Sequence, residues 1–201
     1  SLRSIDMRTI LVLNAKGGSG KTTVATNLAG FYASEGAKVA LVDHDPQGSS
    51  LDWLSVRPKD RPKIAAVDGA SKNRIRVPRS TDVVIMDAPS RTHDEQLAAL
   101  VRRAQTIVLP VVPSPIDMRA AQRFLRELRE LRNLVETDVK LTTVANRVRE
   151  GSQIANELED YLFELKLPSG RKFPFITMLR QSTNYIRSAE KGLSIFEFSP
   201  V

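Results

Sequence analysis

The chain carries the glycine-rich run Lys16-Gly17-Gly18-Ser19-Gly20-Lys21-Thr22-Thr23 between an apolar segment and a segment with helical spacing. Residues 9–14 before it predict a buried strand, and residues 24–29 after it predict a helix. In this context glycines let backbone N–H groups turn toward phosphate oxygens, and the helix N-terminus adds a positive dipole. Lys21 is placed to reach the β- and γ-phosphates of a nucleotide, and the Thr22 hydroxyl to bind Mg²⁺. The run therefore predicts a phosphate-binding loop.

This loop departs from the general phosphate-loop pattern at its entrance. The pattern has glycine five residues before Gly20, where this chain has Ala15, and a second lysine, Lys16, follows. Lys-Gly-Gly-x-Gly-Lys-Thr resembles the deviant Walker A loop of ParA/MinD-type ATPases. The resemblance implies a Mg²⁺-dependent ATPase that binds ATP and ADP, with nucleotide contacts from Gly17, Gly18, Ser19, Gly20, Lys21, Thr22 and Thr23.

The same resemblance implies catalytic roles for both lysines, Lys21 in its own subunit and Lys16 in the other. In the family the early lysine crosses the interface of an ATP-bound homodimer and touches the partner's nucleotide. Arginine fingers that act in this way contribute about 10³–10⁵ in rate. A merely flexible glycine turn is the alternative interpretation of the loop.

The length and composition fit one soluble globular domain. Of the 201 residues, 41% are hydrophobic and none is cysteine, which excludes disulfide frameworks and the iron–sulfur members of this ATPase class. No run is long and apolar enough to span a membrane, and no signal peptide is evident, so we expect a cytoplasmic protein. We expect residues 8–201 to form the domain and set residues 1–6 aside as an added leader before a native Met7.

Strand-like apolar segments alternate with helical ones along the chain. The pattern predicts strands over 10–14, 39–42, 64–67, 83–86, 106–109 and 141–145, and helices over 22–34, 50–54, 95–103, 120–135 and 154–165. Buried strands separated by helices indicate an α/β fold, a doubly wound, mostly parallel sheet flanked by helices. We expect mobile loops at 57–61 and 167–172.

Two predicted strand ends carry carboxylates. The segment 43–48, Asp-His-Asp-Pro-Gln-Gly, resembles the switch of ParA ATPases, which implies that Asp45 orients the attacking water and Asp43 supports Mg²⁺ or its water shell. An Asx-turn is the alternative for Asp45. Asp87 ends four apolar residues in a Walker B arrangement, which predicts a Mg²⁺ contact. Ala88 and Pro89 follow, where many ParA relatives have two prolines.

Two later segments add expectations near the nucleotide. Residues 109–117, with three prolines, resemble the rigid turn of small ParA proteins, which lies near the nucleotide and the dimer interface; a plain structural turn is equally consistent. Asn146 and Arg147 follow the sixth predicted strand, and in related ATPases an asparagine here contacts adenine. An asparagine that merely ends a strand is the alternative.

The net charge of +7 favours a polyanionic partner such as DNA, although a basic protein without one has the same charge. The arginines of the predicted helix 120–135 are interleaved with glutamates, which favours a solvated face. Residues 180–189 resemble the C-terminal part of small ParA proteins, which implies DNA binding without sequence preference by Arg180, Arg187 and Lys191. His44 and His93 are expected in exposed loops, and Trp53 in packing.

The resemblance to small ParA-type ATPases implies a positioning ATPase, associated with the nucleoid, whose ATP-bound homodimer binds DNA. A small adaptor protein would stimulate slow hydrolysis, and the cargo would be a plasmid or a protein assembly such as a carboxysome or chemoreceptor cluster. A membrane-associated ATPase like MinD is the alternative, although the C-terminal residues 194–201 lack a basic amphipathic helix. A metabolic synthetase of the same loop class is a third interpretation.

Overall fold

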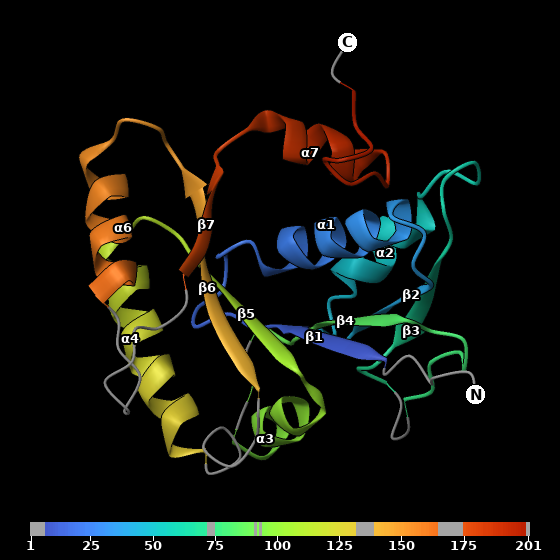
Figure 1. Cartoon of the computed structure of the whole chain (residues 1–201), viewed down its shortest axis with the longest axis horizontal. Coiled ribbons are helices and arrows are strands. Elements are labelled where there is room, and N and C mark those ends of the chain that lie inside the picture. Colours follow the sequence, from blue (N-terminus) through green and yellow to red (C-terminus); the bar gives the residue numbers. More distant parts are fainter. Residues whose placement is uncertain are drawn as a thin grey trace, which may run out of the picture. The chain divides into compact units, whose positions relative to one another are not determined.

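A computed structural model describes residues 7–71, 75–90, 92, 94–131, 139–164 and 175–199 of the chain. Strands and helices alternate along most of it, and β4 follows β3 directly in the order of elements (Figure 1). The strands are β1 (Arg8–Val12), β2 (Val39–Asp43), β3 (Ile64–Asp68), β4 (Val83–Asp87), β5 (Thr106–Val111), β6 (Lys140–Val148) and β7 (Phe175–Arg180). The helices are α1 (Lys21–Ser34), α2 (Ser49–Ser55), α3 (Asp94–Arg103), α4 (Pro115–Glu130), α6 (Gln153–Glu164) and α7 (Thr183–Glu190).

The seven strands form a sheet in the order β3-β2-β4-β1-β5-β6-β7, which confirms the predicted α/β fold class. The β2–β3, β2–β4, β5–β6 and β6–β7 pairs are parallel. The register aligns Asp43, the last residue of β2, with Asp68 on one side and Asp87 on the other. Because parallel strands end at the same edge, two of the carboxylates that the sequence singled out lie on neighbouring strand ends.

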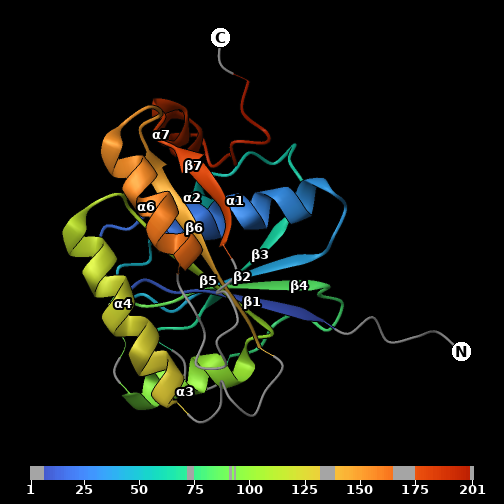
Figure 2. The same cartoon turned by 60° about the vertical axis from the view of Figure 1, so that its left-hand side comes forward.

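The chain divides into two compact units, of which the first is drawn from residues 1–10, 22–89 and 183–201. In this unit α1 and α2 lie on the same face of β2, β3 and β4 (Figures 1 and 2). Leu41 of β2 and Ile85 of β4 are completely buried, as expected for strands covered on both faces. Trp53 of α2 is 5% exposed, which confirms its predicted packing role.

The second unit comprises residues 11–21 and 90–182. In both views α4 and α6 lie side by side (Figure 2), and the Tyr161 hydroxyl of α6 donates a hydrogen bond of 3.1 Å to the Met118 carbonyl of α4. Leu128 of α4 and Leu158 and Leu162 of α6 are fully buried. Their spacing gives each helix one apolar stripe, which it buries inside the unit.

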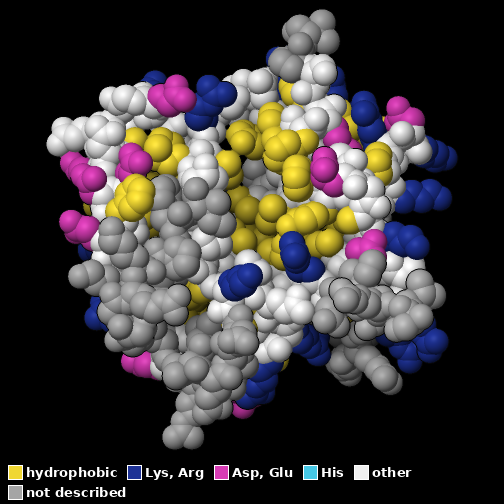
Figure 3. Space-filling view, in the orientation of Figure 1, with side chains coloured by type: hydrophobic (Ala, Val, Ile, Leu, Met, Phe, Trp, Pro, Cys, Tyr) yellow, Lys and Arg dark blue, Asp and Glu magenta, His cyan; other side chains and the backbone are white. Residues whose placement is uncertain are grey.

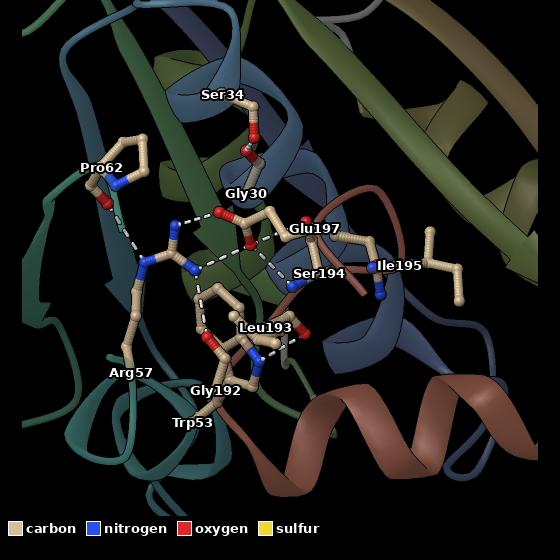
Figure 4. Close-up of polar contacts among 11 residues, drawn as sticks. Gly30, Ser34, Trp53, Arg57, Pro62, Gly192, Leu193, Ser194, Ile195 and Glu197 are labelled. Atoms are coloured by element: carbon tan, nitrogen blue, oxygen red, sulfur yellow. Dashed lines mark hydrogen bonds and ion pairs between the residues drawn. The ribbon is translucent and has the colours of Figure 1, made fainter. Parts of the chain in front are cut away.

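The C-terminal segment of the first unit is fastened to α1 and α2 by a group of polar contacts (Figure 4). Arg57 donates two parallel hydrogen bonds to Glu197, of 3.0 and 2.6 Å, and both side chains are 5% exposed. Glu197 Oε2 also accepts the backbone N–H and the hydroxyl of Ser194, each at 2.9 Å. Trp53 Nε1 donates to the Leu193 carbonyl at 3.3 Å. We call Arg57, Glu197, Ser194, Leu193 and Trp53 the C-terminal clasp.

Two glycines make room for this clasp. Gly192 has φ of +64°, and a Cβ there would lie 2.5 Å from the Cα and the backbone N of Arg57. On α1, a Cβ at Gly30 would lie 2.4 Å from Cβ of Ser194. Neither position accepts a side chain without displacing the segment that follows α7.

Several sequence-based expectations need correction. The helix predicted over 120–135 begins at Pro115, because Ser114 caps it and Pro115 occupies its first turn. The proline-rich stretch is thus not a simple turn, since Pro110 also belongs to β5. Strand β7 and helix α7 were not predicted. Arg57, expected in a mobile loop, is an anchor of the clasp.

His93 and the expected loop at 167–172 lie outside the described residues. His44, expected in an exposed loop, is 5% exposed. Among the helices of the described residues, none is long and apolar enough to cross a membrane.

Candidate functional site

The glycine-rich loop connects β1 to the N-terminus of α1, as the sequence predicts. Gly18 and Gly20 have φ of +87° and +86°, a backbone conformation that other residues adopt only with strain. The Asn14 side chain donates to the Lys16 carbonyl at 2.8 Å and fixes the entrance of the loop. Lys21 is the first residue of α1 and is 5% exposed. The loop therefore has the backbone geometry that lets N–H groups converge on an anion at a helix N-terminus.

Asn146, expected to contact adenine, braces the loop in this structure. Its Nδ2 donates to the Ser19 carbonyl at 2.8 Å, and the residue is 5% exposed. A Cβ at Gly20 would lie 2.1 Å from that Nδ2, so the backbone at position 20 and the amide share one tight contact. The strand end β6 thus helps to shape the phosphate loop, a role that the sequence did not indicate.

Lys16, at the loop entrance, forms an ion pair within its own chain. Its Nζ lies 3.6 Å from Asp117 Oδ2, and the lysine side chain is 49% exposed whereas that of Asp117 is 11% exposed. Asp117 lies in the first turn of α4, where its carboxylate accepts from the Ser114 hydroxyl at 2.9 Å and its N–H donates to the same oxygen at 3.3 Å. The sequence placed Asp117 in a proline-rich turn and gave no indication of this pair.

In the first unit, Asp87 receives two side-chain hydroxyls. Thr22 Oγ1 donates to Asp87 Oδ2 at 2.9 Å, and Ser50 Oγ donates to the same oxygen at 2.5 Å. Ser50 is completely buried, and sequence reasoning missed it. Only the location of Ser50 in the sequence could have indicated this role, since it lies in the first turn of the helix that follows the Asp-Pro-Gln-Gly segment. Hydroxyl and carboxylate oxygens are the hard ligands that Mg²⁺ prefers, so Thr22 and Asp87 fit the metal that the sequence predicts.

Asp43 holds the backbone that leads into α2. Its Oδ1 accepts the N–H of Asp45 at 2.9 Å, and its Oδ2 accepts those of Ser50 at 2.9 Å and Leu51 at 3.2 Å. Burial raises the pKa of Asp43, the charge of Asp87 raises it further, and the three backbone hydrogen bonds offset part of this. A nearby cation would relieve the charge repulsion between Asp43 and Asp87, which fits a Mg²⁺ site on this side of the sheet.

Asp45 adopts the geometry of the alternative interpretation. Its Oδ1 accepts the N–H of Gln47 at 3.0 Å, which is an Asx-turn, and the residue is 8% exposed. Gly48 ends the turn with φ of +67° and is the N-cap of α2. The turn and a water-orienting role are compatible, because the carboxylate keeps further acceptor capacity.

An open pocket of about 350 Å³ lies beside Thr22 in the first unit. Thr22 and Thr23 of α1, Asp52 and Trp53 of α2, and Glu190 of α7 contribute to its walls. The start of α1 therefore borders both the carboxylate cluster and a cavity that reaches α7.

The three cations expected to bind DNA make two different sets of contacts. Arg180 at the end of β7 lies 3.7 Å from Glu150, with both side chains more than 70% exposed (73% and 74%). Arg187 of α7 and Lys191 just beyond it lie over the ring of Phe198, at 5.8 and 5.5 Å from its centroid. These two cations are one helical turn apart, so the structure brings them together on one side of α7.

Exposed apolar side chains also occur in the first unit. Hydrophobic side chains gather over α1 and α7 (Figure 3). Phe31 of α1, Ile186 of α7 and Phe196 of the C-terminal segment are exposed. Phe31 and Phe196 pack against each other with ring centroids 5.1 Å apart. The C-terminal part of the first unit thus presents both cations and aromatic rings to solvent.

A family model matches residues 10–195 of the chain, that of the CobQ/CobB/MinD/ParA nucleotide-binding domain. Among curated proteins, the chain is 39% identical over 199 residues to maintenance of carboxysome distribution protein A of Gloeobacter kilaueensis, covering 95% of this chain and 85% of that protein. It is 27% identical to the protein of the same description from Halothiobacillus neapolitanus, covering 94% and 87%. Its identity to the chromosome-partitioning ATPase Soj of Thermus thermophilus is also 27%, covering 96% and 89%.

Solved structures share the fold at low sequence identity. The McdA protein of Cyanothece superposes with a TM-score of 0.72 and 16% identity, covering 95% of this chain and 92% of that one. MinD of Aquifex aeolicus, in complex with MinC, superposes with a TM-score of 0.69 and 17% identity, covering 94% of this chain and 87% of that one. At such identities the superpositions support the fold.

Proposed function

Because the chain belongs to the CobQ/CobB/MinD/ParA family of nucleotide-binding domains, we propose that it is a positioning ATPase that forms a homodimer around ATP. The observation that carries this proposal is 39% identity over 95% of the chain to a carboxysome distribution protein, combined with the two lysines of the loop. The cargo we propose is a protein assembly of the carboxysome kind. A plasmid or a chemoreceptor cluster would be served by the same cycle.

In this proposal, residues of the loop and of the two strand ends bind the phosphates and Mg²⁺. Backbone N–H groups of Gly17 to Gly20 hold the phosphates, and Lys21 neutralises charge on the β- and γ-phosphates. Thr22 and Asp87 hold Mg²⁺, which when bound would neutralise charge on the phosphate oxygens, and Asp43 supports the metal's water shell.

Asp45 orients the water that attacks the γ-phosphate, and Lys16 of each protomer stabilises the charge that develops on the partner's nucleotide. Asn146 remains our choice for adenine. Its hydrogen bond to Ser19 supports this choice, because it fixes the amide next to the phosphate loop.

DNA is the surface on which we propose the cargo moves. The net charge of +7 and the paired cations Arg187 and Lys191 support this, together with Arg180. Contacts of this kind bind phosphates without reading bases, so no sequence preference is expected. A small adaptor protein on the cargo would stimulate hydrolysis, after which the ADP form releases DNA.

Cosedimentation of the full chain with random-sequence duplex DNA tests this function. We expect retention with Mg²⁺-ATP and loss of retention with ADP, with EDTA, or in the Lys16→Ala variant. A triple variant, Arg180→Glu, Arg187→Glu and Lys191→Glu, should lose DNA. Its matched control, Lys59→Glu, Arg61→Glu and Lys63→Glu, has the same net charge and reverses three exposed cations elsewhere, so it should keep most binding.

Parallel samples with anionic lipid vesicles separate the alternative. Retention on vesicles but not on DNA would replace the DNA-based proposal by a MinD-like membrane function. The absence of ATP-dependent retention on either surface would contradict the proposed function as a whole.

A further inference from the structure

The contact between Lys16 and Asp117 joins one fixed partner to one movable partner. Asp117 is 11% exposed and is held through Ser114, which both donates to its carboxylate and accepts its N–H. Pro115 fixes the backbone at the start of the same turn. Lys16 is 49% exposed and reaches the carboxylate with a flexible side chain. The carboxylate is therefore a built receptor, and the ammonium group can leave it at little cost in packing.

We propose that Asp117 is a positioning residue that holds Lys16 within its own protomer and releases it when two protomers pair around ATP. This inference rests on the proposed function, in which Lys16 acts on the partner's nucleotide. In the proposed dimer, the phosphates of the partner's nucleotide would compete with Asp117 for the single ammonium group that lies 3.6 Å from it here. The pair thus stabilises the unpaired protomer and opposes dimerisation until nucleotide phosphates compete for the lysine.

The exposure of the Lys16–Asp117 pair sets how strongly it weakens dimerisation. Partly exposed ion pairs shift an equilibrium by about 1.4- to 5-fold. Two lysines are released in each dimer, so the dissociation constant of the dimer should be raised by about 2- to 30-fold. The pair would set a threshold for assembly and leave the chemistry of hydrolysis unchanged.

The test compares dimer dissociation constants by sedimentation equilibrium of the full chain with Mg²⁺ and a slowly hydrolysed ATP analogue. Asp117→Asn keeps the size of the side chain and an oxygen acceptor for Ser114 and removes the charge. We expect it to dimerise about 2- to 30-fold more tightly than the natural chain at low salt. The difference should shrink at about 1 M salt, where the Debye length falls to about 3 Å. Glu127→Gln, an exposed acid on the same helix, is the matched control and should change nothing.

A double-mutant cycle separates positioning from a structural role of Asp117. In a Lys16→Ala background without nucleotide, Asp117→Asn should no longer change the free energy of unfolding, whereas an effect on helix α4 alone would persist. An Asp117→Asn dimer that is weaker than or equal to the natural dimer would overturn the inference.

A measurement without nucleotide distinguishes a failure of the Lys16–Asp117 contact from a failure of the proposed function. In NMR spectra of the chain with ¹³C-labelled lysine, the Lys16 Cε resonance should move in Asp117→Asn and stay in place in Glu127→Gln. If the natural chain fails to dimerise yet this resonance moves, the proposed function fails and the contact stands. An unmoved resonance would contradict the contact itself.

Discussion

The Arg57–Glu197 pair and the Lys16–Asp117 pair are two ion pairs of opposite character. The first is bidentate, with distances of 2.6 and 3.0 Å, and both side chains are 5% exposed. The second is a single contact of 3.6 Å in which the lysine is 49% exposed. Burial makes breaking the first pair expensive, because either charge left alone would be poorly solvated. The second pair can open at little cost, so one pair is suited to fastening a segment and the other to releasing a side chain.

Removal of Arg57 should produce the largest effect. Arg57→Ala leaves Glu197 as a buried carboxylate without its cation, and we expect a loss of about 3–5 kcal/mol in the free energy of unfolding. Urea unfolding followed by the fluorescence of Trp53, the single tryptophan of the chain, measures it. Arg57→Met combined with Glu197→Leu is the control, because replacing both charges with apolar groups removes the unpaired ion. A single variant that loses less than about 1 kcal/mol would show that the clasp is open in solution.

A side chain at Gly192 should have the next largest effect. Gly192→Ala combines a φ of +64° with a Cβ that would lie 2.5 Å from the Arg57 backbone, and we expect a loss of about 2–4 kcal/mol. Gly151→Ala is the matched control, because Gly151 has φ of +74° but nothing within 4 Å of the added Cβ. It should lose only the strain energy of about 1–2 kcal/mol. Thermal unfolding of both variants gives the comparison, and equal losses would rule out the close approach.

Lowering the pH should reduce the stability that the buried Arg57–Glu197 pair contributes. Burial raises the pKa of Glu197, but the Arg57 and Ser194 hydrogen bonds outweigh burial and lower it below the ordinary 4.5. A lowered folded pKa means that Glu197 contributes stability above pH 4.5 and loses it as the pH falls through the folded pKa. Melting temperatures of the natural chain should therefore fall more steeply below pH 4.5 than those of Glu197→Gln. Parallel curves would contradict the assignment.

The exposed pair should have the smallest effect on stability. Asp117→Asn should change the free energy of unfolding by less than about 1 kcal/mol, because a half-exposed pair gains little from its charges. The same urea titration measures it, beside Arg57→Ala. A loss of about 3 kcal/mol or more would erase the contrast between the two pairs and make Asp117 a structural residue.

The nucleotide loop and most of the sheet could be predicted from the sequence because their causes are local. Residues 83–86 form a continuous apolar run before Asp87, and the observed strand is Val83–Asp87. The start of α4 was predicted too late, because Pro115 was interpreted as part of a turn although Ser114 and Pro115 are a capping signal.

What the sequence could not show are contacts between distant residues. Arg57 and Glu197 are 140 positions apart, and neither has a local pattern that names the other. The same holds for Asn146 and Ser19, which are 127 positions apart. Ser50 has no motif of its own, and only the register of β2 and β4 brings its helix to Asp87. Strand β7 follows a stretch with proline and glycine, which interrupted the periodic pattern.

Gly30 carries a consequence for how relatives of this chain should vary. It lies inside α1, where alanine favours the helix by about 1 kcal/mol over glycine, and Ser194 and Glu197 lie nearest to where its Cβ would go. The residue at position 30 and the presence of the C-terminal tail, which begins at Gly192, should therefore covary among relatives. A homologue whose chain stops before the equivalent of residue 192 is free to carry alanine there, whereas one that keeps the tail must keep the glycine. The residue at position 30, far upstream of the tail in an alignment, would thus record whether the tail is packed against α1.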